Sequence, residues 1–186
     1  GWRSLDIQVR RLVGVGFLFG LARFSEGFLI LKALDVGLAP AWSPLALAIF
    51  RLSFMILAYP AGALSDRVAP RSLLLAGIAV LIAANLWLAQ ATAVWAVFAG
   101  VAVWGGHMAL TQGIFARMIA DAAPERQRAT SFGAFFFATG VATLLASLGA
   151  GYLWDRGGPA ETFTVSAGVA ALAGTMLWLL PERRSR

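Results

Sequence analysis

Four residues that can carry charge or donate hydrogen bonds interrupt long apolar stretches of the sequence. Arg23 and Glu26 lie in one apolar run, Arg51 lies in the next run, and His107 lies in a later one. In a membrane-spanning helix a central charge costs about 2.5–3.5 kcal/mol on the insertion scale. Such residues therefore pair with one another or face a water-filled cavity, where they can bind a solute or relay a proton.

Arg23 and Glu26 are three positions apart, so one continuous helix would place them on the same face. Two interpretations stay open: an ion pair that locks helices together, or a pair that binds a substrate or proton. Arg51 has no acidic residue in its own run, so we expect Glu26 to serve both arginines. The excess positive charge would favour an anionic or carboxylate-bearing solute. The alternative for Arg51 is that it snorkels or binds backbone carbonyls.

Trp104, His107 and Thr111 recur at helical spacing and form one stripe. Trp104 could stack on a ligand, and His107 could bond to the ligand or relay a proton. The alternative is that His107 is a hydrogen-bonded packing residue. Because His107 is the single histidine and there is no cysteine, we expect no metal site and no cofactor.

The composition sets the class of protein that must position these side chains. Of 186 residues, 60% are hydrophobic and 13% are charged, whereas a soluble domain has about 45–50% and about 25%. Lipid must therefore be part of the solvent. Six runs reach the length of about 20 residues that a spanning helix needs. They predict an all-α membrane protein with helices over residues 12–34, 42–63, 72–90, 94–117, 130–153 and 162–180, a lead-in over 1–11 and a tail over 181–186.

The net charge of +6 reports topology and not nucleic-acid binding, because the basic residues lie in short turns between the runs. With six spans, Lys32 and Arg156 lie toward one side of the membrane. All the other Lys and Arg residues outside the helix interiors lie on the opposite side: Arg3, Arg10, Arg11, Arg67, Arg71, Arg117, Arg126, Arg128, Arg183, Arg184 and Arg186. This split predicts cytoplasmic termini and a multi-pass protein of a bacterial inner membrane. The first apolar run is too long and too charged for a signal peptide.

A short internal sequence repeat supports this topology. Residues 62–67 and 151–156 both read G-x-L-x-D-R, and each copy ends the second helix of a set of three. Matching places on opposite sides of the membrane predict a 3+3 inverted repeat. Gly16 with Gly20, and the stripe Gly140, Thr143, Ser147 and Gly151, predict faces where helices approach closely.

The stretch from Gly62 to Arg71 resembles the signature loop of the major facilitator superfamily, G-x-L-[AS]-D-[RK]-x-G-[RK]-[RK]. Here Ala69 replaces the glycine and Pro70 replaces one basic residue. Residues 120–133 are similar to the family's turn between the fourth and fifth helices, and Arg23-Phe-Ser-Glu26 is similar to the opening of the C-terminal half in some bacterial members. The resemblance implies half of a twelve-helix transporter. The degenerate loop and the basic lead-in and tail favour the C-terminal half.

The resemblance also implies roles for the helices. The first and fourth helices would line a central cavity, the second and fifth would meet the other half, and the third and sixth would face lipid. The substrate or coupling set would then be Arg23, Glu26, Arg51, Trp104, His107 and Thr111. A conformational gate would be formed by Gly62, Asp66, Arg67, Arg71, Asp121 and Arg128.

The sequence thus predicts secondary active transport of a small solute by alternating access, with an anion favoured and protons as the expected coupling ion. The other half would be supplied in cis or by a second copy, and because the chain begins with Gly we expect a piece of a longer protein. The rival interpretation is a non-transporting membrane subunit or scaffold that only assembles with partner helices. No enzyme motif of the G-x-S-x-G, H-E-x-x-H or phosphate-loop kind is present, so we expect no enzymatic activity.

The topology is tested by cysteine labelling, because the chain has no native cysteine. Cysteines at Ala39 and Glu161 should react with a membrane-impermeant thiol reagent added outside the cell. A cysteine at Ser185 should react only after the membrane is opened. Labelling of Ser185 from outside would refute cytoplasmic termini.

Overall fold

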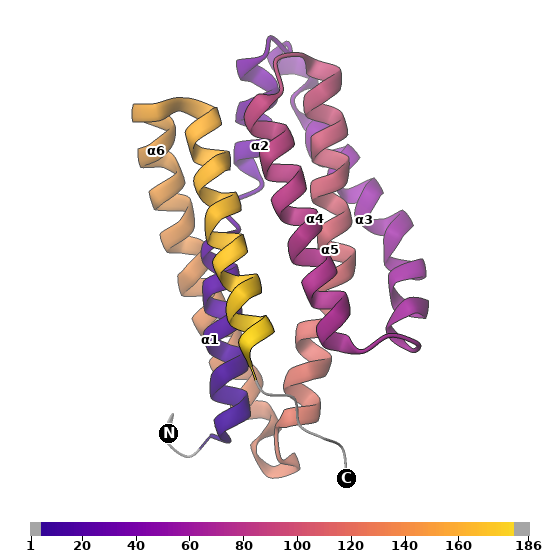
Figure 1. Cartoon of the computed structure of the whole chain (residues 1–186). Coiled ribbons are helices and arrows are strands. Elements are labelled where there is room, and N and C mark those ends of the chain that lie inside the picture. Colours follow the sequence, from indigo (N-terminus) through magenta and orange to yellow (C-terminus); the bar gives the residue numbers. More distant parts are fainter. Residues whose placement is uncertain (1–4, 181–186) are drawn as a thin grey trace.

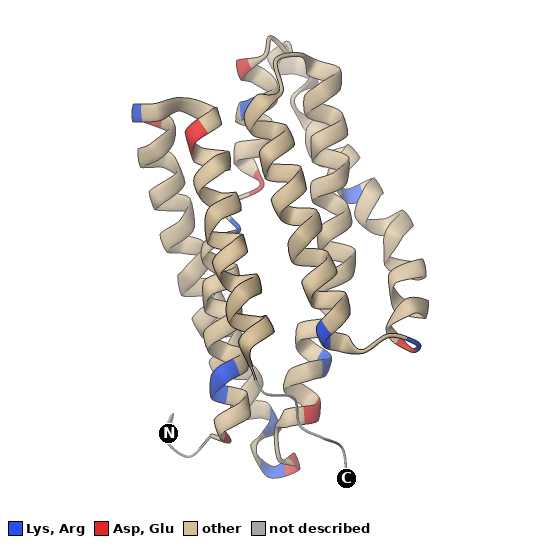
Figure 2. Cartoon of the chain, in the orientation of Figure 1, with Lys and Arg blue, Asp and Glu red and all other residues tan. Residues whose placement is uncertain are grey.

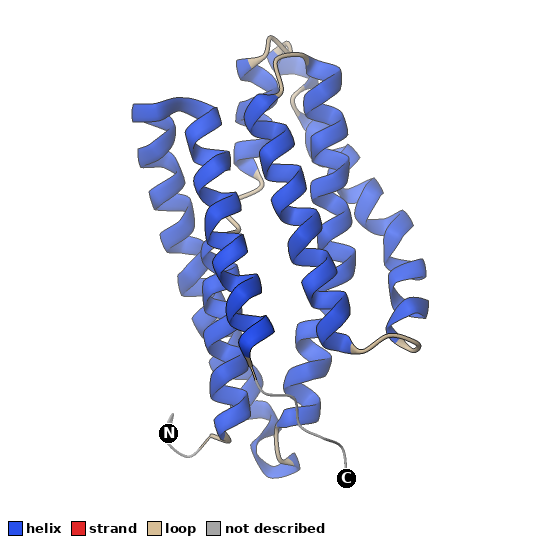
Figure 3. Ribbon diagram, in the orientation of Figure 1, coloured by secondary structure: helices blue, strands red, loops and turns tan. Residues whose placement is uncertain are grey.

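The computed structural model describes residues 5–180, and these residues form helices joined by short turns, without any strand (Figures 1 and 3). The first four residues and the expected tail at 181–186 lie outside the described part. The helices are α1 (Ile7–Leu21), α2 (Gly27–Asp35), α3 (Pro44–Ser65), α4 (Pro70–Gln90), α5 (Val94–Ala122) and α6 (Arg128–Leu179), with short 3-10 turns at η2 (Pro40–Trp42) and η3 (Glu125–Gln127).

Local chemistry explains where these helices begin. The Asp6 carboxylate accepts a hydrogen bond from the Gln8 N–H at 2.7 Å and so caps the start of α1. Pro44 and Pro70 are the first residues of α3 and α4, where the missing proline N–H removes no helical hydrogen bond. Pro70 thus starts α4 at a position where the signature loop has a basic residue.

The helix α6 reverses direction within its length. Gly158 has φ 76°, a backbone conformation that favours glycine, and Pro159 follows it. Figure 1 shows the two arms of α6 running side by side, residues 128–157 as the first arm and 159–179 as the second arm. The two arms occupy the region where the sequence predicts separate helices over 130–153 and 162–180.

The structure corrects the prediction of one continuous helix over 12–34. The helix α1 ends at Leu21, α2 begins at Gly27, and the chain between them is not helical. This interval, residues 22–26, is called the helix break below. It contains Arg23 and Glu26, which a continuous helix would place on one face.

The remaining helices surround this break. The helix α1 packs against α6, α4 packs against both α5 and α6, and α3 lies against α5 at the edge of the bundle (Figure 1). Within the described residues, four helical stretches are long and apolar enough to cross a membrane: Pro40–Ser65, Pro70–Gln90, Val94–Ala122 and Glu125–Leu179. Six spans related as two sets of three remain a prediction, since α1 and α2 are each too short to cross alone.

Close approach of α1 to the first arm of α6 confirms the predicted contact face at Gly16 and Gly20. A Cβ atom on Gly20 would lie 2.8 Å from the Ala142 Cβ, and one on Gly16 would collide with the Phe135 ring. The other predicted face differs, because a Cβ on Gly140 or Gly151 would meet nothing within 4 Å. Those two glycines therefore make no close helix contact within the described chain.

Gly20→Ala should destabilise the protein by about 1–3 kcal/mol, because the added methyl group overpacks the α1–α6 contact. Adding Ala142→Gly should restore much of the lost stability, since it removes the atom that the new methyl group meets. The measurement is the midpoint of thermal unfolding in detergent. Gly140→Ala is the control and should leave this midpoint nearly unchanged; an equal loss in the control would contradict the packing argument.

Candidate functional site

The helix break places two opposite charges at two helix ends. Arg23 follows the C-terminal end of α1, and Glu26 is the N-terminal cap residue of α2. A helix carries partial negative charge at its C-terminus and partial positive charge at its N-terminus, so each side chain lies at the helix end that favours its charge. The break thereby lowers the cost of two charges within an apolar bundle.

Glu26 pairs across the bundle with Arg51 of α3. The Glu26 Oε2 and Arg51 Nη2 atoms are 2.6 Å apart, and the side chains are 27% and 61% exposed. The Arg51 guanidinium also lies 4.8 Å from the centre of the neighbouring Phe50 ring. Both side chains of the pair are therefore accessible in this chain, and few other charges lie along the middle of the helices (Figure 2).

Arg23 has a different environment from the one that its spacing to Glu26 predicted. Its Nη2 atom is 3.2 Å from the Met108 sulfur, and its guanidinium carbon is 5.6 Å from the centre of the Phe19 ring. The Nε atom is buried and has no hydrogen-bond partner within the described residues. In this part of the chain, Glu26 thus forms its ion pair with Arg51 alone and is not shared by two arginines.

Trp104, His107 and Thr111 are fully buried in the bundle. The His107 Nδ1 contacts the Trp104 carbonyl oxygen, which can only accept, so this nitrogen carries the proton. The Thr111 hydroxyl donates to the His107 carbonyl at 2.9 Å, and its methyl group abuts Gly77 of α4. In this conformation the three side chains are packing residues set apart from the exposed Glu26–Arg51 pair, and their contact with a solute stays a prediction.

The predicted gate residues lie where α3 ends, α4 begins and α5 ends. The Ser65 hydroxyl donates to the Gly62 carbonyl at 2.7 Å, and Arg71 donates to the Trp178 carbonyl near the end of α6. Asp66, Arg67, Asp121 and Arg128 are exposed. Arg71 is thus bound to the second arm of α6, whereas the other four charged residues of the predicted gate have exposed side chains.

Sequence reasoning missed Arg117 as a member of this cluster. Its Nη1 donates to the Ser65 carbonyl at 2.8 Å and so caps the end of α3, while its Nε lies 4.0 Å from the Asp121 carboxylate. The four-residue spacing of Arg117 and Asp121 on one helix was the available signal.

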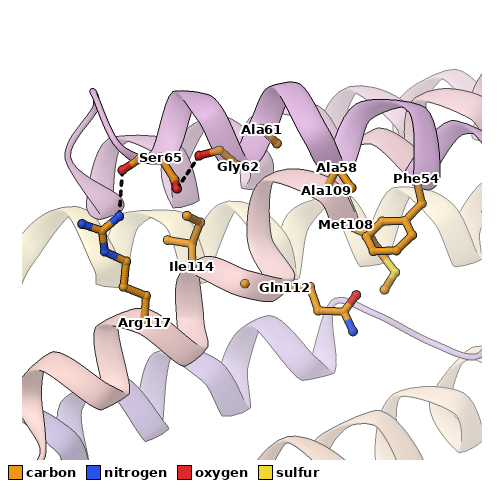
Figure 4. Close-up of a pocket in the computed structure, with 11 residues that line it drawn as sticks. Phe54, Ala58, Ala61, Gly62, Ser65, Met108, Ala109, Gln112, Ile114 and Arg117 are labelled. Carbon is orange, nitrogen blue, oxygen red and sulfur yellow. Dashed lines mark hydrogen bonds between the residues drawn. The ribbon is translucent and has the colours of Figure 1, made fainter.

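A groove of about 320 Å³ runs along the contact between α3 and α5 (Figure 4). Small residues form most of its walls, Met108 and Phe54 lie at one end, and Ser65 and Arg117 lie at the other. Because the Met108 sulfur touches Arg23, the inner end of the groove adjoins this half-buried arginine.

Long apolar helices with a charged pair at a helix break define a multi-pass membrane protein. The chain belongs to the Major Facilitator Superfamily, whose family model matches residues 12–186. It is 30% identical over 184 residues to an uncharacterized MFS-type transporter of Methanocaldococcus jannaschii, covering 95% of this chain and 46% of the relative. The chain therefore spans about half the length of this relative.

Solved structures show the same fold. The POT family transporter PepTSo superposes with a TM-score of 0.74 at 14% identity, over 96% of this chain and 39% of that protein. An auto-inhibited POT family peptide transporter gives a TM-score of 0.69 at 18% identity, over 97% of this chain and 40% of that protein.

The pairing of Glu26 is tested by double-mutant cycles on unfolding stability in detergent. Glu26→Gln and Arg51→Gln should show a coupling energy of up to about 1 kcal/mol, because the pair is partly exposed. The cycle of Glu26→Gln with Arg23→Gln should give a smaller value, since their side chains form no ion pair. Equal coupling in both cycles would restore the shared-acid prediction.

Proposed function

We propose that this chain is the C-terminal six-helix half of a secondary active transporter that works by alternating access in a bacterial inner membrane. Family membership supports transport in place of enzymatic catalysis. The two copies of G-x-L-x-D-R support the 3+3 inverted repeat. One ends α3 at one end of the bundle, and the other leads into the reversal of α6 at the opposite end (Figure 1).

Exposed apolar surface supports a missing second half. The helix α3 and the first arm of α6 expose large apolar side chains in this chain. These side chains are Leu52, Met55, Ile56, Tyr59, Phe136, Phe137, Leu144 and Leu148, and they need protein or lipid to cover them. Gly62 near the end of α3 also supports a missing partner surface, because a Cβ there would meet nothing within 4 Å in this chain. We infer that these two helices meet the second half, supplied in cis or by another copy.

The accessible Glu26–Arg51 pair at the helix break is the observation that carries the transport proposal. An anionic solute can replace Glu26 as the partner of Arg51. The released Glu26 carboxylate can then accept the proton that is carried with the anion. The site gains one negative charge from the anion and one positive charge from the proton, so its net charge is constant. This balance favours proton-coupled transport of a small anion.

The proposal differs from a scaffold role in what it requires of this pair. A scaffold half needs the exposed apolar faces but no accessible ion pair at mid-bundle. The first experiment is therefore an uptake screen of radiolabelled mono- and dicarboxylates and inorganic phosphate, over a range of pH, in proteoliposomes that contain the full-length protein. Absence of uptake by a correctly inserted protein would favour the scaffold.

Glu26→Gln keeps the shape of the side chain and removes its titration. For any anion that the screen identifies, this variant should lose the pH dependence of uphill uptake while exchange of the anion across the membrane continues. The matched control is Glu161→Gln, an exposed residue beyond the reversal of α6, which should behave as the parent. Uphill uptake with the parent pH profile in Glu26→Gln would make Glu26 structural and place coupling elsewhere.

A further inference from the structure

We propose that Ser147 and Ser166, one on each arm of α6, are positioning residues that hold the helix break in the geometry in which Glu26 meets Arg51. Both hydroxyl groups form hydrogen bonds with backbone atoms of the break, and within the described residues neither forms a hydrogen bond with Arg23, Glu26 or Arg51. The consequence for transport rests on the proposed function, whereas the geometry rests on the contacts alone.

Ser166 fixes the α1 side of the break. Its hydroxyl donates at 2.7 Å to the carbonyl of Ala22, where α1 stops, and it accepts from the Asn85 Nδ2 of α4 at 2.8 Å. All three residues are buried. A buried carbonyl at a helix end needs a donor from outside the helix. The chain Asn85–Ser166–Ala22 supplies this donor and so stabilises the point at which α1 ends.

Ser147 fixes the α2 side of the break. Its hydroxyl oxygen accepts the Ser25 N–H at 3.0 Å, while its own proton goes to the Thr143 carbonyl at 2.8 Å. Ser25 directly precedes Glu26, so this bond sets the position of the backbone from which the Glu26 side chain extends. The contact is more exposed than the one at Ser166, and it lies beside the Glu26–Arg51 pair.

A break of this kind needs a donor on one side and an acceptor on the other, and a hydroxyl group can serve as either. Alanine would fill similar space but satisfy neither backbone group, whereas threonine would keep the hydroxyl. The reversal at Gly158 lets one element, α6, supply both contacts from its two arms.

The second arm offers matched controls. Thr162 is buried as Ser166 is, but its hydroxyl donates to the Gly158 carbonyl of its own helix at 3.0 Å. Thr164 is exposed, and its hydroxyl donates to the Ala160 carbonyl at 2.7 Å. Thr162→Val and Thr164→Val thus each remove a hydroxyl from α6 without touching the helix break.

The test uses a cysteine reporter in the full-length protein, reconstituted in proteoliposomes. Ser25→Cys keeps the backbone N–H that Ser147 accepts, and these 186 residues contain no other cysteine; any cysteine elsewhere in the protein is replaced. The readout is the rate at which a charged methanethiosulfonate reagent labels this cysteine. Ser147→Ala and Ser166→Ala should each change the rate roughly fivefold, the effect of losing one hydrogen bond. Ser166→Thr should restore the parent rate, and the two threonine controls should keep it.

Rates within twofold of the parent for both alanine variants, or equal changes in the threonine controls, would overturn the positioning role whatever the transport result. If Ser166→Ala fails to accumulate in the membrane, the more exposed Ser147→Ala carries the test. The second readout is the pH profile of anion uptake, which should shift in both alanine variants and return in Ser166→Thr. A changed labelling rate with an unchanged pH profile would keep the geometric role and refute its link to transport.

Discussion

The interruption between α1 and α2 is the constraint on which the site depends. A continuous helix over residues 12–34 would bury Arg23 and Glu26 on one face, with no helix ends nearby to favour their charges. Ending α1 at Leu21 and starting α2 at Gly27 creates a negative and a positive helix end, and the two charges lie at the ends that suit them. The break also turns Glu26 toward Arg51 and leaves Arg23 against the Met108 sulfur and the Phe19 ring.

The rest of the half accommodates this interruption. A broken helix leaves backbone groups without helical partners, and in an apolar bundle they must be satisfied by neighbouring segments. The arms of α6 lie close enough to do so because α1 packs tightly against α6, with the Phe135 ring over Gly16 and the Ala142 methyl group over Gly20. The reversal at Gly158 brings the second arm back along the bundle, so a single long element borders the break twice.

Much of the architecture could be predicted from the sequence. Apolar length placed α3, α4 and α5 within a few residues of their observed bounds, and the Gly16 and Gly20 spacing identified a true close contact. The Glu26–Arg51 pair followed from a count of charges, because Arg51 had no acidic residue in its own helix. The interval between the predicted helices over 130–153 and 162–180 contains Gly158, at which α6 reverses.

The helix break itself could not be predicted by the same reasoning. The segment from Ala22 to Glu26 contains neither proline nor glycine, and the spacing of its two charges also fits one face of a continuous helix. Tertiary contacts from Ser147 and Ser166 stabilise the interruption, and these residues are more than 100 positions away in the chain. The surroundings of His107 could not be predicted for a related reason, because the periodicity of one helix does not say whether its stripe faces a cavity or a neighbouring helix. The structure buries the stripe, and its contact with a solute stays a prediction.

The most direct test of this account is the backbone conformation of Arg23, Phe24 and Ser25 in the full-length protein in lipid. Carbon chemical shifts from solid-state nuclear magnetic resonance, with these residues selectively labelled, report that conformation. The account predicts helical shifts through Leu21, non-helical shifts at these three residues, and helical shifts again from Gly27. Uninterrupted helical shifts from Leu12 to Leu34 would contradict it.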